Sequence, residues 1–553
     1  MKKLISVLIV GLMLLSGCTS GESTTSSITD GSYTATKTGR KGPIEVEVLV
    51  ENGAISNVNI LSEYESAIYS DEALERIPSL IVEYQTTNVD VVSGATFTSS
   101  AIISAVEDCL SQAGNTTGFN DEIPSAEVVD ITIDCDVAIM GGGAAGLMAG
   151  ITAAEAGKEV VIVETLGYAG GNLLSAVGVI AGPGSKVQQE YGIEMTPESY
   201  LEGKIATRAA LPLTDYYDET PERTLIFYQE NRIICDWISD RGIEYVEPPM
   251  GVSHTLAPGY YLGVPNFTNF LIETFEAAGG VIYYETTGTE LIMEGDAVVG
   301  FMAESKEANY TINAPSTLVA TGGFTSNSEM VAEIYPEFET MYSTAMCSNT
   351  GEGLTMIEDA GGVTEALDAG IHKIPVTTIG KIDIPFFCIM STAVLVNTDG
   401  ERFISEAGNP PAMMELMIAE HDGKGYFVFD EGDKELLWDT FRSIFDLGAV
   451  NEYSSFEEAA EDLNMPSLVA QMESYNEDAM NGADQQFNRS FNLDPIDGDK
   501  IYVLAIEPGL YLTYGGVKTD NDMHVVTADD EIITGLYAAG DITGSTEVKE
   551  GFG

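Results

Sequence analysis

Apolar and polar residues alternate along two neighbouring stretches near the start of the chain. The first runs from Ile44 to Val50 and the second from Ile55 to Ile60, with Asn52-Gly53 between them. A period of two predicts half-buried β strands, and an Asn-Gly pair between two such strands predicts a hairpin. Apolar residues with helical spacing follow from Ala101 to Cys109. Together these patterns predict a small α+β unit over residues 31–113.

A second pattern predicts a βαβ unit. Two apolar runs, Cys135–Met140 and Val160–Val163, flank a helix-forming stretch, Leu147–Ala156, and the second run ends at Glu164. The turn before the helix is rich in small residues, namely Gly141, Gly143, Ala144, Ala145 and Gly146. This order is typical of dinucleotide binding: glycines make the tight turn, the helix N-terminus receives the pyrophosphate, and the terminal acid binds ribose hydroxyls. A glycine-rich turn without a ligand is the alternative.

The N-terminus predicts export and lipid attachment. Lys2 and Lys3 precede an apolar run, Leu4 to Leu15, which is too short to span a bilayer as a stable helix. The run is therefore interpreted as a signal peptide over residues 1–17. Leu15-Ser16-Gly17-Cys18 resembles a bacterial lipobox, which implies a diacylglyceryl group on the Cys18 thiol. A chance cysteine after an ordinary secretory signal is the alternative. Residues 18–30, rich in Ser and Thr, predict a flexible tether.

Charge and cysteine usage narrow the possible partners. Of 553 residues, 87 are acidic and 24 basic, giving a formal net charge of −63. Phosphate binding needs basic residues, so the composition argues against nucleic acid, and the same field would repel an anionic membrane surface. Membrane attachment is therefore expected through lipid chains. The chain has four His, six Cys without close pairs and no CxxCH, so we expect no metal or c-type haem, and redox chemistry would need an organic cofactor.

The segment Asp90 to Thr98 carries a specific resemblance. Its sequence, Asp-Val-Val-Ser-Gly-Ala-Thr-Phe-Thr, matches the motif of FMN-binding domains that carry covalent flavin. The residues of the motif expected at the cofactor are Ser93, Gly94, Ala95, Thr96 and Thr98. The resemblance implies that a separate flavin transferase links FMN through its phosphate to Thr98, which we expect at the start of a helix. The alternative reading makes Ser93, Thr96 and Thr98 turn and N-cap residues.

Three later segments resemble, in order, the FAD contacts of the fumarate reductase and succinate dehydrogenase flavoprotein superfamily. They contain Gly170, Gly171 and Asn172; Thr321, Gly322 and Gly323; and Gly540 and Asp541. Relatives with covalent FAD use a His, and the stretch after Asn172 has none, so the resemblance implies non-covalent FAD. The whole layout resembles extracellular flavin reductases of the flavocytochrome c and urocanate reductase type.

The expected fold is multidomain, with a small α+β FMN-binding domain followed by an α/β Rossmann-type FAD-binding domain with an inserted α+β capping domain. The FMN-binding domain is expected over residues 31–113 and a linker over 114–130. The FAD-binding domain is expected over 131–364 and 509–553, with the capping domain, over 365–508, excluding water from the flavin. The superfamily usually continues past the last glycine motif, so the second part of the FAD-binding domain is expected to be incomplete.

The active site departs from the superfamily pattern. The segment Gly400–Glu406, which contains Arg402, matches the stretch that precedes the usual Arg proton donor, but Pro410 stands near the donor's position. Tyr511 and Tyr514 occupy a segment where relatives carry a His, and a Tyr phenol can protonate a developing enolate. His372 matches another substrate-contacting His. Packing roles for either Tyr and a surface role for His372 are the alternatives.

Two functions of different classes follow. In the first, a membrane donor, either a quinol or a flavoprotein, reduces FMN, and electrons pass through FAD to an activated C=C bond of a small organic acceptor. The acceptor is expected to be neutral or singly charged, because a buried dicarboxylate needs several cations. In the second, the protein is an electron carrier with a degenerate reductase domain. Either would act at the extracellular face of the cell membrane.

Overall fold

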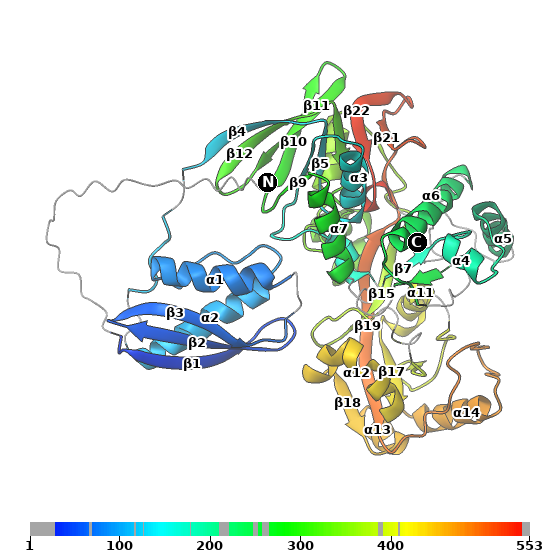
Figure 1. The fold of residues 1–553 in the computed structure, drawn as a ribbon. Coiled ribbons are helices and arrows are strands. Elements are labelled where there is room, and N and C mark those ends of the chain that lie inside the picture. The colour runs from blue at the N-terminus through cyan, green and yellow to red at the C-terminus, as the bar shows by residue number, and fades with distance from the viewer. Residues whose placement is uncertain are drawn as a thin grey trace.

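The computed structural model describes most of the chain (Figure 1). The described residues are 28–65, 69–114, 118–124, 127–176, 178–209, 221–246, 253–256, 265–384, 387, 391–407 and 410–544. The predicted signal peptide, Cys18 and almost all of the predicted tether lie outside these residues. Across the described ranges, no helix combines the length and the apolar composition that a membrane crossing requires.

The N-terminal unit is a three-stranded antiparallel sheet with two helices packed on it. Its strands are β1 (Gly31–Thr38), β2 (Pro43–Glu51) and β3 (Ala54–Ser62), and its helices are α1 (Asp71–Tyr84) and α2 (Thr96–Ala113). Asn52 and Gly53 have φ angles of 55° and 75°, as a tight turn between β2 and β3 requires. Helix α2 begins earlier than the apolar spacing predicts, because its first turn is largely polar.

The central unit is built on a six-stranded sheet in the order β21-β22-β13-β5-β6-β9. The strands are β5 (Val137–Met140), β6 (Val160–Val163), β9 (Val281–Tyr283), β13 (Ser316–Val319), β21 (His524–Val526) and β22 (Ile532–Ala538). All neighbours are parallel except β21 and β22. Helices α3 (Ala144–Glu155) and α7 (Pro265–Ala277) pack on it through one apolar cluster. The predicted strand–helix–strand order is present as β5-α3-β6.

A four-stranded sheet, β10-β11-β12-β4, packs beside the central sheet. It consists of β4 (Val129–Asp134), β10 (Thr287–Glu294), β11 (Ala297–Glu304) and β12 (Ala308–Asn313). Strand β4 pairs in parallel with β12. Its first residues fall within the stretch that the sequence predicted to be a linker. Most of its side chains are exposed, so apolar patterning could not reveal it.

The lateral unit contains a five-stranded antiparallel sheet and lies below the central unit in Figure 1. Its strands are β15 (Ile371–Thr377), β16 (Val394–Val396), β17 (Gly425–Asp430), β18 (Val450–Tyr453) and β19 (Ile501–Thr513). Its helices are α11 (Pro410–His421), α12 (Glu431–Asp446), α13 (Phe456–Asp462) and α14 (Leu468–Met480). The long strand β19 runs from this unit toward the central unit.

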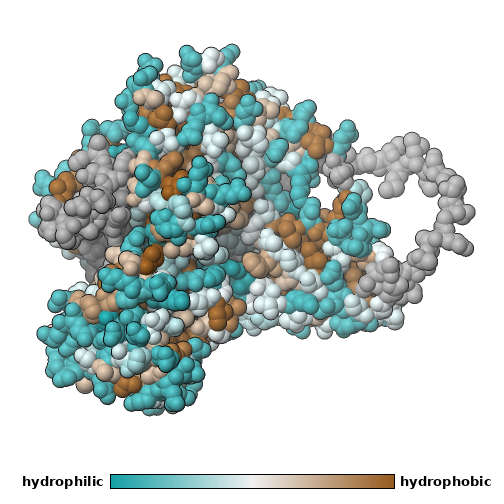
Figure 2. Space-filling view, turned by 180° about the vertical axis from the view of Figure 1, so that it is seen from behind, coloured by the Kyte–Doolittle hydropathy of each residue, from teal (hydrophilic) through white to brown (hydrophobic). Residues whose placement is uncertain are grey.

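The remaining helices and strands complete the described fold. They are η1 (Gly171–Ser175), β7 (Val179–Ala181), α4 (Lys186–Glu190), α5 (Pro197–Ala209), α6 (Pro221–Asp240), β8 (Ser253–Thr255), α8 (Ser328–Ile334), η2 (Pro336–Phe338), α9 (Glu352–Asp359), β14 (Thr364–Glu365), β20 (Gly516–Val517) and η3 (Asp541–Thr543). Hydrophilic residues cover most of the face shown in Figure 2, with smaller hydrophobic patches between them. This surface agrees with the large excess of acidic residues.

The N-terminal unit contacts the central unit through rings and ion pairs. The Tyr69 and Tyr168 rings meet edge to face with centroids 5.3 Å apart. The Tyr168 hydroxyl donates a hydrogen bond of 3.4 Å to the carbonyl oxygen of Gly94. Arg76 forms an ion pair with Glu285, and Lys306 lies 2.7 Å from an oxygen of Asp90. These contacts hold the Asp90–Thr98 segment against the loop that follows β6.

Candidate cofactor and active site

A cavity of about 450 Å³ lies at the carboxyl edge of the parallel strands β5, β6 and β13. Ligands in open α/β sheets bind at this edge. Many of the residues singled out in the sequence line the cavity: Ser93, Gly141, Gly143, Ala144, Ala145, Glu164, Gly171, Asn172, Thr321, Gly322, Gly540 and Asp541. Gly146, Gly170 and Gly323 are chain neighbours of these lining residues. Segments far apart in sequence therefore meet around one space.

The glycine-rich turn is shaped by close backbone packing. Gly141 has a φ of 100°, and a Cβ there would lie 2.3 Å from the Ala320 carbonyl oxygen. A Cβ on Gly146 would lie 2.0 Å from the Gly141 carbonyl oxygen. Gly143 caps the N-terminus of α3, and the nearest atom to a Cβ there is 3.9 Å away. The turn thus leaves room for an anion beside the free N–H groups of the helix.

Glu164 lies at the end of β6 with its carboxylate buried. The carboxylate accepts backbone hydrogen bonds from Gly142 at 2.8 Å and from Leu166 at 2.9 Å. Burial raises the pKa of Glu164 to about 7 despite these hydrogen bonds. Each carboxylate oxygen keeps a second lone pair, which suits a bond from a ribose hydroxyl.

The opposite wall contains a small amide and carboxyl cluster. Asn172 and Asn349 donate hydrogen bonds of 3.2 and 3.4 Å to Asp541. Burial raises the pKa of Asp541 to about 6. The Oδ1 of Asn349 is buried without a hydrogen-bond partner among the described residues. An unpaired buried acceptor is costly, so this wall is suited to a ligand that donates a hydrogen bond. Sequence reasoning missed Asn349, because no glycine motif or apolar pattern singles it out.

The FMN-motif segment borders the same cavity through Ser93, while Thr98 lies farther along, in the first turn of α2. Thr98 is the third residue of α2, which corrects the expectation that it opens the helix. The N-cap position is Ala95, and no side chain caps the helix there. The Thr98 hydroxyl donates a hydrogen bond to Glu65, and Thr98 is only 3% exposed. Capping therefore does not explain why the segment carries three hydroxyl residues.

The structure brings His372, Tyr511 and Tyr514 together. Antiparallel pairing of β15 with β19, with a register shift next to His372, places His372 and Tyr511 on neighbouring strands, and Tyr514 directly follows β19. The His372 ring lies 5.9 Å from the Tyr511 ring and 6.3 Å from the Tyr514 ring, measured between centroids. Burial, helped by the charge of Lys373, lowers the pKa of His372 to about 4. Burial raises the pKa of Tyr511, with further contributions from Asp383 and Asp541. At neutral pH the His372 ring and the Tyr511 phenol are therefore uncharged.

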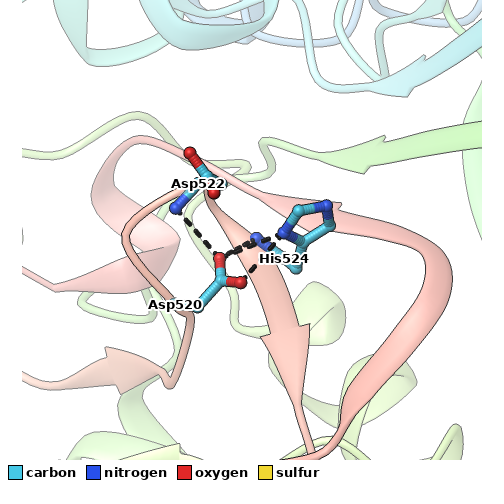
Figure 3. Close-up of side chains that lie close together, drawn as sticks. All are labelled: Asp520, Asp522 and His524. Carbon is cyan, nitrogen blue, oxygen red and sulfur yellow. Dashed lines mark hydrogen bonds and ion pairs between the residues drawn. The ribbon is translucent and has the colours of Figure 1, made fainter.

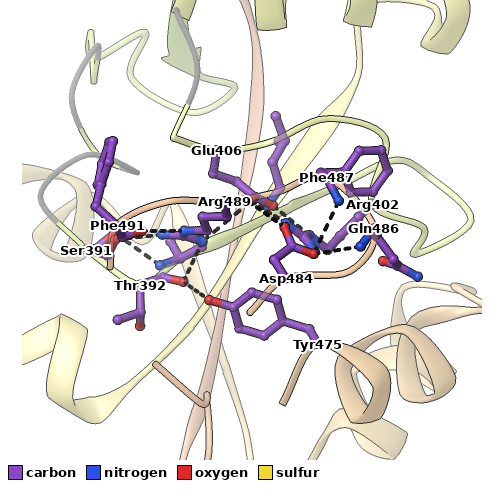
Figure 4. A network of polar contacts seen from close by, with 12 residues as sticks. Ser391, Thr392, Arg402, Glu406, Tyr475, Asp484, Gln486, Phe487, Arg489 and Phe491 are labelled. Atoms are coloured by element: carbon purple, nitrogen blue, oxygen red, sulfur yellow. Dashed lines mark hydrogen bonds and ion pairs between the residues drawn. The ribbon is translucent and has the colours of Figure 1, made fainter. Parts of the chain in front are cut away.

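Arg402, which the sequence suggested as a catalytic residue, is not part of this cluster. It lies inside the lateral unit, where its guanidinium binds Glu406 at 2.7 Å and Asp484 at 3.0 Å (Figure 4). All three side chains are completely buried. Burial alone would raise the pKa of Asp484, but hydrogen bonds from Arg402 lower it to about 2. Four of the five N–H donors of Arg402 are bonded to these two carboxylates, and its side chain is completely buried, so its contacts stabilise the lateral unit.

Arg489 completes this buried network. It donates hydrogen bonds to the backbone carbonyl oxygens of Ser391, Thr392 and Ala393 at 2.9–3.1 Å. It also lies 3.5 Å from Glu406. The segment that precedes β16 is thereby fixed to the loop after α14 (Figure 4). We call Arg402, Glu406, Asp484 and Arg489 the arginine network.

One group of side chains has the composition of a metal site. In the described part of the chain, Asp520, Asp522 and His524 are the single such group, with ligand atoms within 4.8 Å of one another (Figure 3). An Asp520 oxygen accepts the backbone N–H groups of Asp522 and His524 at 3.0 and 2.9 Å, and the carboxylate contacts His524 Nδ1. These contacts account for the group as a hydrogen-bonded turn.

Comparison with protein families agrees with this site. Residues 136–550 match the FAD binding domain model, and residues 39–111 match the FMN-binding domain model. The chain belongs to the FAD binding domain family. It combines a small FMN-binding domain with a large FAD-binding domain, and the resemblance inferred from the sequence is confirmed. It is an FAD-dependent, fumarate reductase-like oxidoreductase.

Curated relatives are similar over most of the chain. Urocanate reductase of Eggerthella lenta is 27% identical over 97% of this chain and 92% of its own length. The NADH:acrylate oxidoreductase of Vibrio harveyi is 27% identical, and the NADH:fumarate oxidoreductase of Klebsiella pneumoniae is 28% identical. Those two alignments cover 93% and 90% of this chain but only 58% and 54% of the relatives. The chain thus spans little more than half of these longer proteins.

Solved structures share the fold. The open conformation of a flavocytochrome c3 fumarate reductase aligns with a TM-score of 0.62 at 22% identity, over 78% of this chain and 79% of that one. A 3-ketosteroid-Δ4-(5α)-dehydrogenase from Rhodococcus jostii aligns with a TM-score of 0.59 at 21% identity, over 77% of this chain and 95% of that one. At this identity the likeness concerns the fold.

Proposed function

We propose that this protein is an extracellular, lipid-anchored reductase that passes electrons from FMN through FAD to an activated C=C bond. The observation that carries the proposal is the meeting of three parts at one place. The FAD-type cavity is bordered by Ser93 of the FMN motif, and Thr325, three residues after the wall residue Gly322, donates a hydrogen bond of 3.0 Å to the backbone carbonyl oxygen of Tyr511 in the His-Tyr cluster. Cofactor, electron donor and proton donor would therefore be adjacent.

In this proposal the central unit is a Rossmann-type FAD-binding domain and the lateral unit is its capping domain. The parallel order of β13, β5 and β6, with α3 after the glycine-rich turn, supports the first assignment. Strand β19 links the lateral sheet to the cavity region, which supports the second. The cavity residues, with Glu164 at one end and Asn172, Asn349 and Asp541 at the other, would hold non-covalent FAD.

The chain's own residues supply proton transfer and exclusion of water. Bound FAD supplies the electron pair that reduces a C=C bond. Tyr511 keeps its proton at neutral pH, so its phenol is suited to protonate the carbon next to the reduced one. His372 is neutral and lies at the Tyr511 ring, where it orients the phenol. Both side chains are half-buried, which limits the access of water that would compete for the proton.

The charges around this cluster favour a neutral or singly charged acceptor. Lys373, next to His372, donates hydrogen bonds to Glu415 at 2.8 Å and to the Ile371 carbonyl oxygen at 3.0 Å. Its ammonium group is therefore already compensated. A dianion in this region would need cations that are free of such partners. A conjugated enone or a monocarboxylate with a conjugated C=C bond fits these charges.

The test is turnover by the protein loaded with both flavins. Reduced protein is mixed with fumarate and with a matched enone, and reoxidation of the flavin absorbance is followed. We expect faster turnover of the enone, and Tyr511→Phe should lower kcat by about 10²–10⁴-fold, as removal of a general acid does. Tyr514→Phe is the matched control. Efficient turnover of fumarate, with neither Tyr variant slowed, would refute this site.

An electron-carrier function is the second candidate. Phe97 of the FMN motif is 63% exposed. A flavin attached near this residue would be open to an electron acceptor in solution. A carrier would reduce a soluble dye or ferric chelate at full rate without FAD. Electron transfer to such acceptors by a variant that cannot bind FAD distinguishes this function from the reductase, which would lose its C=C activity.

Membrane attachment and the remaining partners are proposed from the sequence. Cys18 would carry the lipid anchor, a flavin transferase would attach FMN to Thr98 by a phosphoester, and a membrane quinol or flavoprotein would donate electrons. Cys18→Ala should release the protein from the membrane fraction of producing cells. Retention of that variant would contradict lipid anchoring without affecting the proposal for the active site.

A further inference from the structure

Glu65 holds the proposed attachment residue from outside its helix. The carboxylate follows β3 in the chain, whereas Thr98 lies in the first turn of α2. One carboxylate oxygen, Oε2, accepts the Thr98 hydroxyl, and the other, Oε1, accepts the Lys41 backbone N–H at 3.0 Å. Gly39 packs so closely that a Cβ there would lie 2.5 Å from Oε1. Two hydrogen bonds and close packing thus fix the position of Glu65. The Thr98 hydroxyl oxygen keeps a lone pair for reaction.

Neither helix capping nor an ion pair accounts for this arrangement. Ala95 occupies the N-cap of α2, and no side chain caps the helix there. Within the described residues, Glu65 forms no ion pair with a basic side chain. A buried hydroxyl aimed at an acidic side chain is instead the geometry of a nucleophile beside its base.

We infer that Glu65 is the general base that activates the Thr98 hydroxyl when FMN is attached. This inference rests on the proposed attachment at Thr98. In the step, Thr98 Oγ forms a bond to the phosphorus of the flavin half of a flavin dinucleotide that the transferase supplies. The pyrophosphate bond breaks and the nucleoside monophosphate leaves. The hydroxyl proton passes to Glu65 and then to solvent, and nothing is oxidised or reduced.

Burial explains why the base belongs to this chain. A threonine hydroxyl is a weak nucleophile at neutral pH unless a base within hydrogen-bond reach removes its proton. Thr98 is only 3% exposed and its O–H group already points at the Glu65 carboxylate, so Glu65 is the group placed to take the proton. A carboxylate already bonded to the hydroxyl needs no rearrangement to act. General-base assistance of this kind contributes about 10²–10⁴-fold to a rate.

The test measures covalent flavin on the denatured chain rather than activity of the loaded enzyme. Apo-protein is incubated with the transferase and FAD, and flavin fluorescence of the denatured band is followed with time. Glu65→Gln keeps the shape of the side chain and should lower the initial labelling rate at least about 100-fold. Glu47→Gln is the matched control. Glu47 lies on β2 and also accepts a hydrogen bond from a hydroxyl group, that of Ser32 at 2.6 Å. This variant should label like the wild type.

A conservative variant separates a base from a structural role. Glu65→Asp retains a carboxylate and should keep part of the labelling rate, whereas a packing defect would lower the rates of Glu65→Asp and Glu65→Gln alike. Far-UV circular dichroism of each apo-protein checks that it folds.

The outcomes also separate this inference from the proposed attachment site. Wild-type or faster labelling of Glu65→Gln, or equal losses of rate in Glu65→Gln and Glu65→Asp, would overturn the role of Glu65 if Thr98→Val remains unlabelled. Labelling of Thr98→Val would instead show that Thr98 is not the acceptor.

Discussion

The cavity of the central unit and the arginine network of the lateral unit are both buried and polar, yet they differ in pairing. In the network, Arg402 is bound by two carboxylates and Arg489 by four carbonyl oxygens. Asn349 lines the cavity of about 450 Å³, and its Oδ1 has no hydrogen-bond partner among the described residues. Because buried polar groups are normally paired, the unpaired region marks a ligand site and the paired one marks a structural site.

The pKa values of the acidic side chains also differ between the cavity and the arginine network. Burial raises the pKa of Glu164 to about 7 and that of Asp541 to about 6, since no cation compensates either group. Asp484 is held at about 2 by Arg402 although burial opposes this. Burial alone therefore does not identify a functional acid. A buried acid that borders a cavity and has no cation beside it is the better candidate.

Arg402→Met should give the largest effect and should act on stability alone. Breaking a buried ion pair leaves uncompensated carboxylates and costs about 3–5 kcal/mol. Denaturant unfolding of the apo-protein should show this loss, while the Kd for FAD of the folded fraction stays at the wild-type value. A large rise in that Kd would mean that the arginine network belongs to the cofactor site after all.

Gly141→Ala should act on FAD binding. The added Cβ would collide with the Ala320 carbonyl oxygen, and the φ of 100° is unfavourable for alanine. We expect FAD affinity to fall by about a hundredfold or more, measured by titration of flavin fluorescence. Gly157→Ala is the control, because Gly157 has a φ of 80° with no atom within 4 Å of a Cβ. Equal losses of affinity in both variants would contradict a specific role for the turn.

Asn349→Leu and Asn476→Leu should have opposite signatures. Asn349 has an unpaired oxygen at the cavity, so its replacement should leave apo stability nearly unchanged and weaken FAD binding by about 1–2 kcal/mol. Asn476 bonds the Ile496 backbone through both its amide nitrogen and its oxygen at 2.8 Å. Its replacement should cost about 1–3 kcal/mol of stability and leave the Kd for FAD unchanged. Identical behaviour of the two variants would remove the distinction drawn above.

His372 gives the smallest expected effect, and it depends on pH. Its folded pKa, about 4, lies below the ordinary value of 6.5, so the folded state favours the neutral ring. This preference contributes fully to the free energy of unfolding above pH 6.5, and the contribution is lost as the pH falls toward 4. Between pH 7 and pH 5 the wild type should lose about 1–2 kcal/mol more stability than His372→Asn. Parallel pH profiles of unfolding would show that His372 is not buried as a neutral ring.

The cofactor cavity was predictable because its signals are local. Strand β5, the glycine-rich turn and helix α3 follow one another directly, so periodicity and turn chemistry are enough to indicate them. The three later glycine segments converge because parallel strands end at one sheet edge. The sequence also pointed to His372, Tyr511 and Tyr514, but the pairing of β15 with β19 that unites them is visible only in the structure.

Contacts between distant segments were not predictable. Arg402 was misinterpreted because Asp484, one of its two partners, lies 82 residues away along the chain. The bond between Thr98 and Glu65 crosses 33 residues and has no sequence signature. Strand β4 was missed because its side chains are mostly exposed and only its backbone pairing with β12 defines it.

The position of Ser93 in the cavity wall has a consequence for how long FAD stays bound. A ligand that leaves a cavity passes the groups at its border, and here part of that border belongs to the N-terminal unit. The Tyr69–Tyr168 contact and the Arg76–Glu285 ion pair hold that unit in place. Separation of the N-terminal unit from the central unit would then limit the dissociation rate of FAD. The residence time of the cofactor would rise with the strength of these ring and ion-pair contacts between the two units.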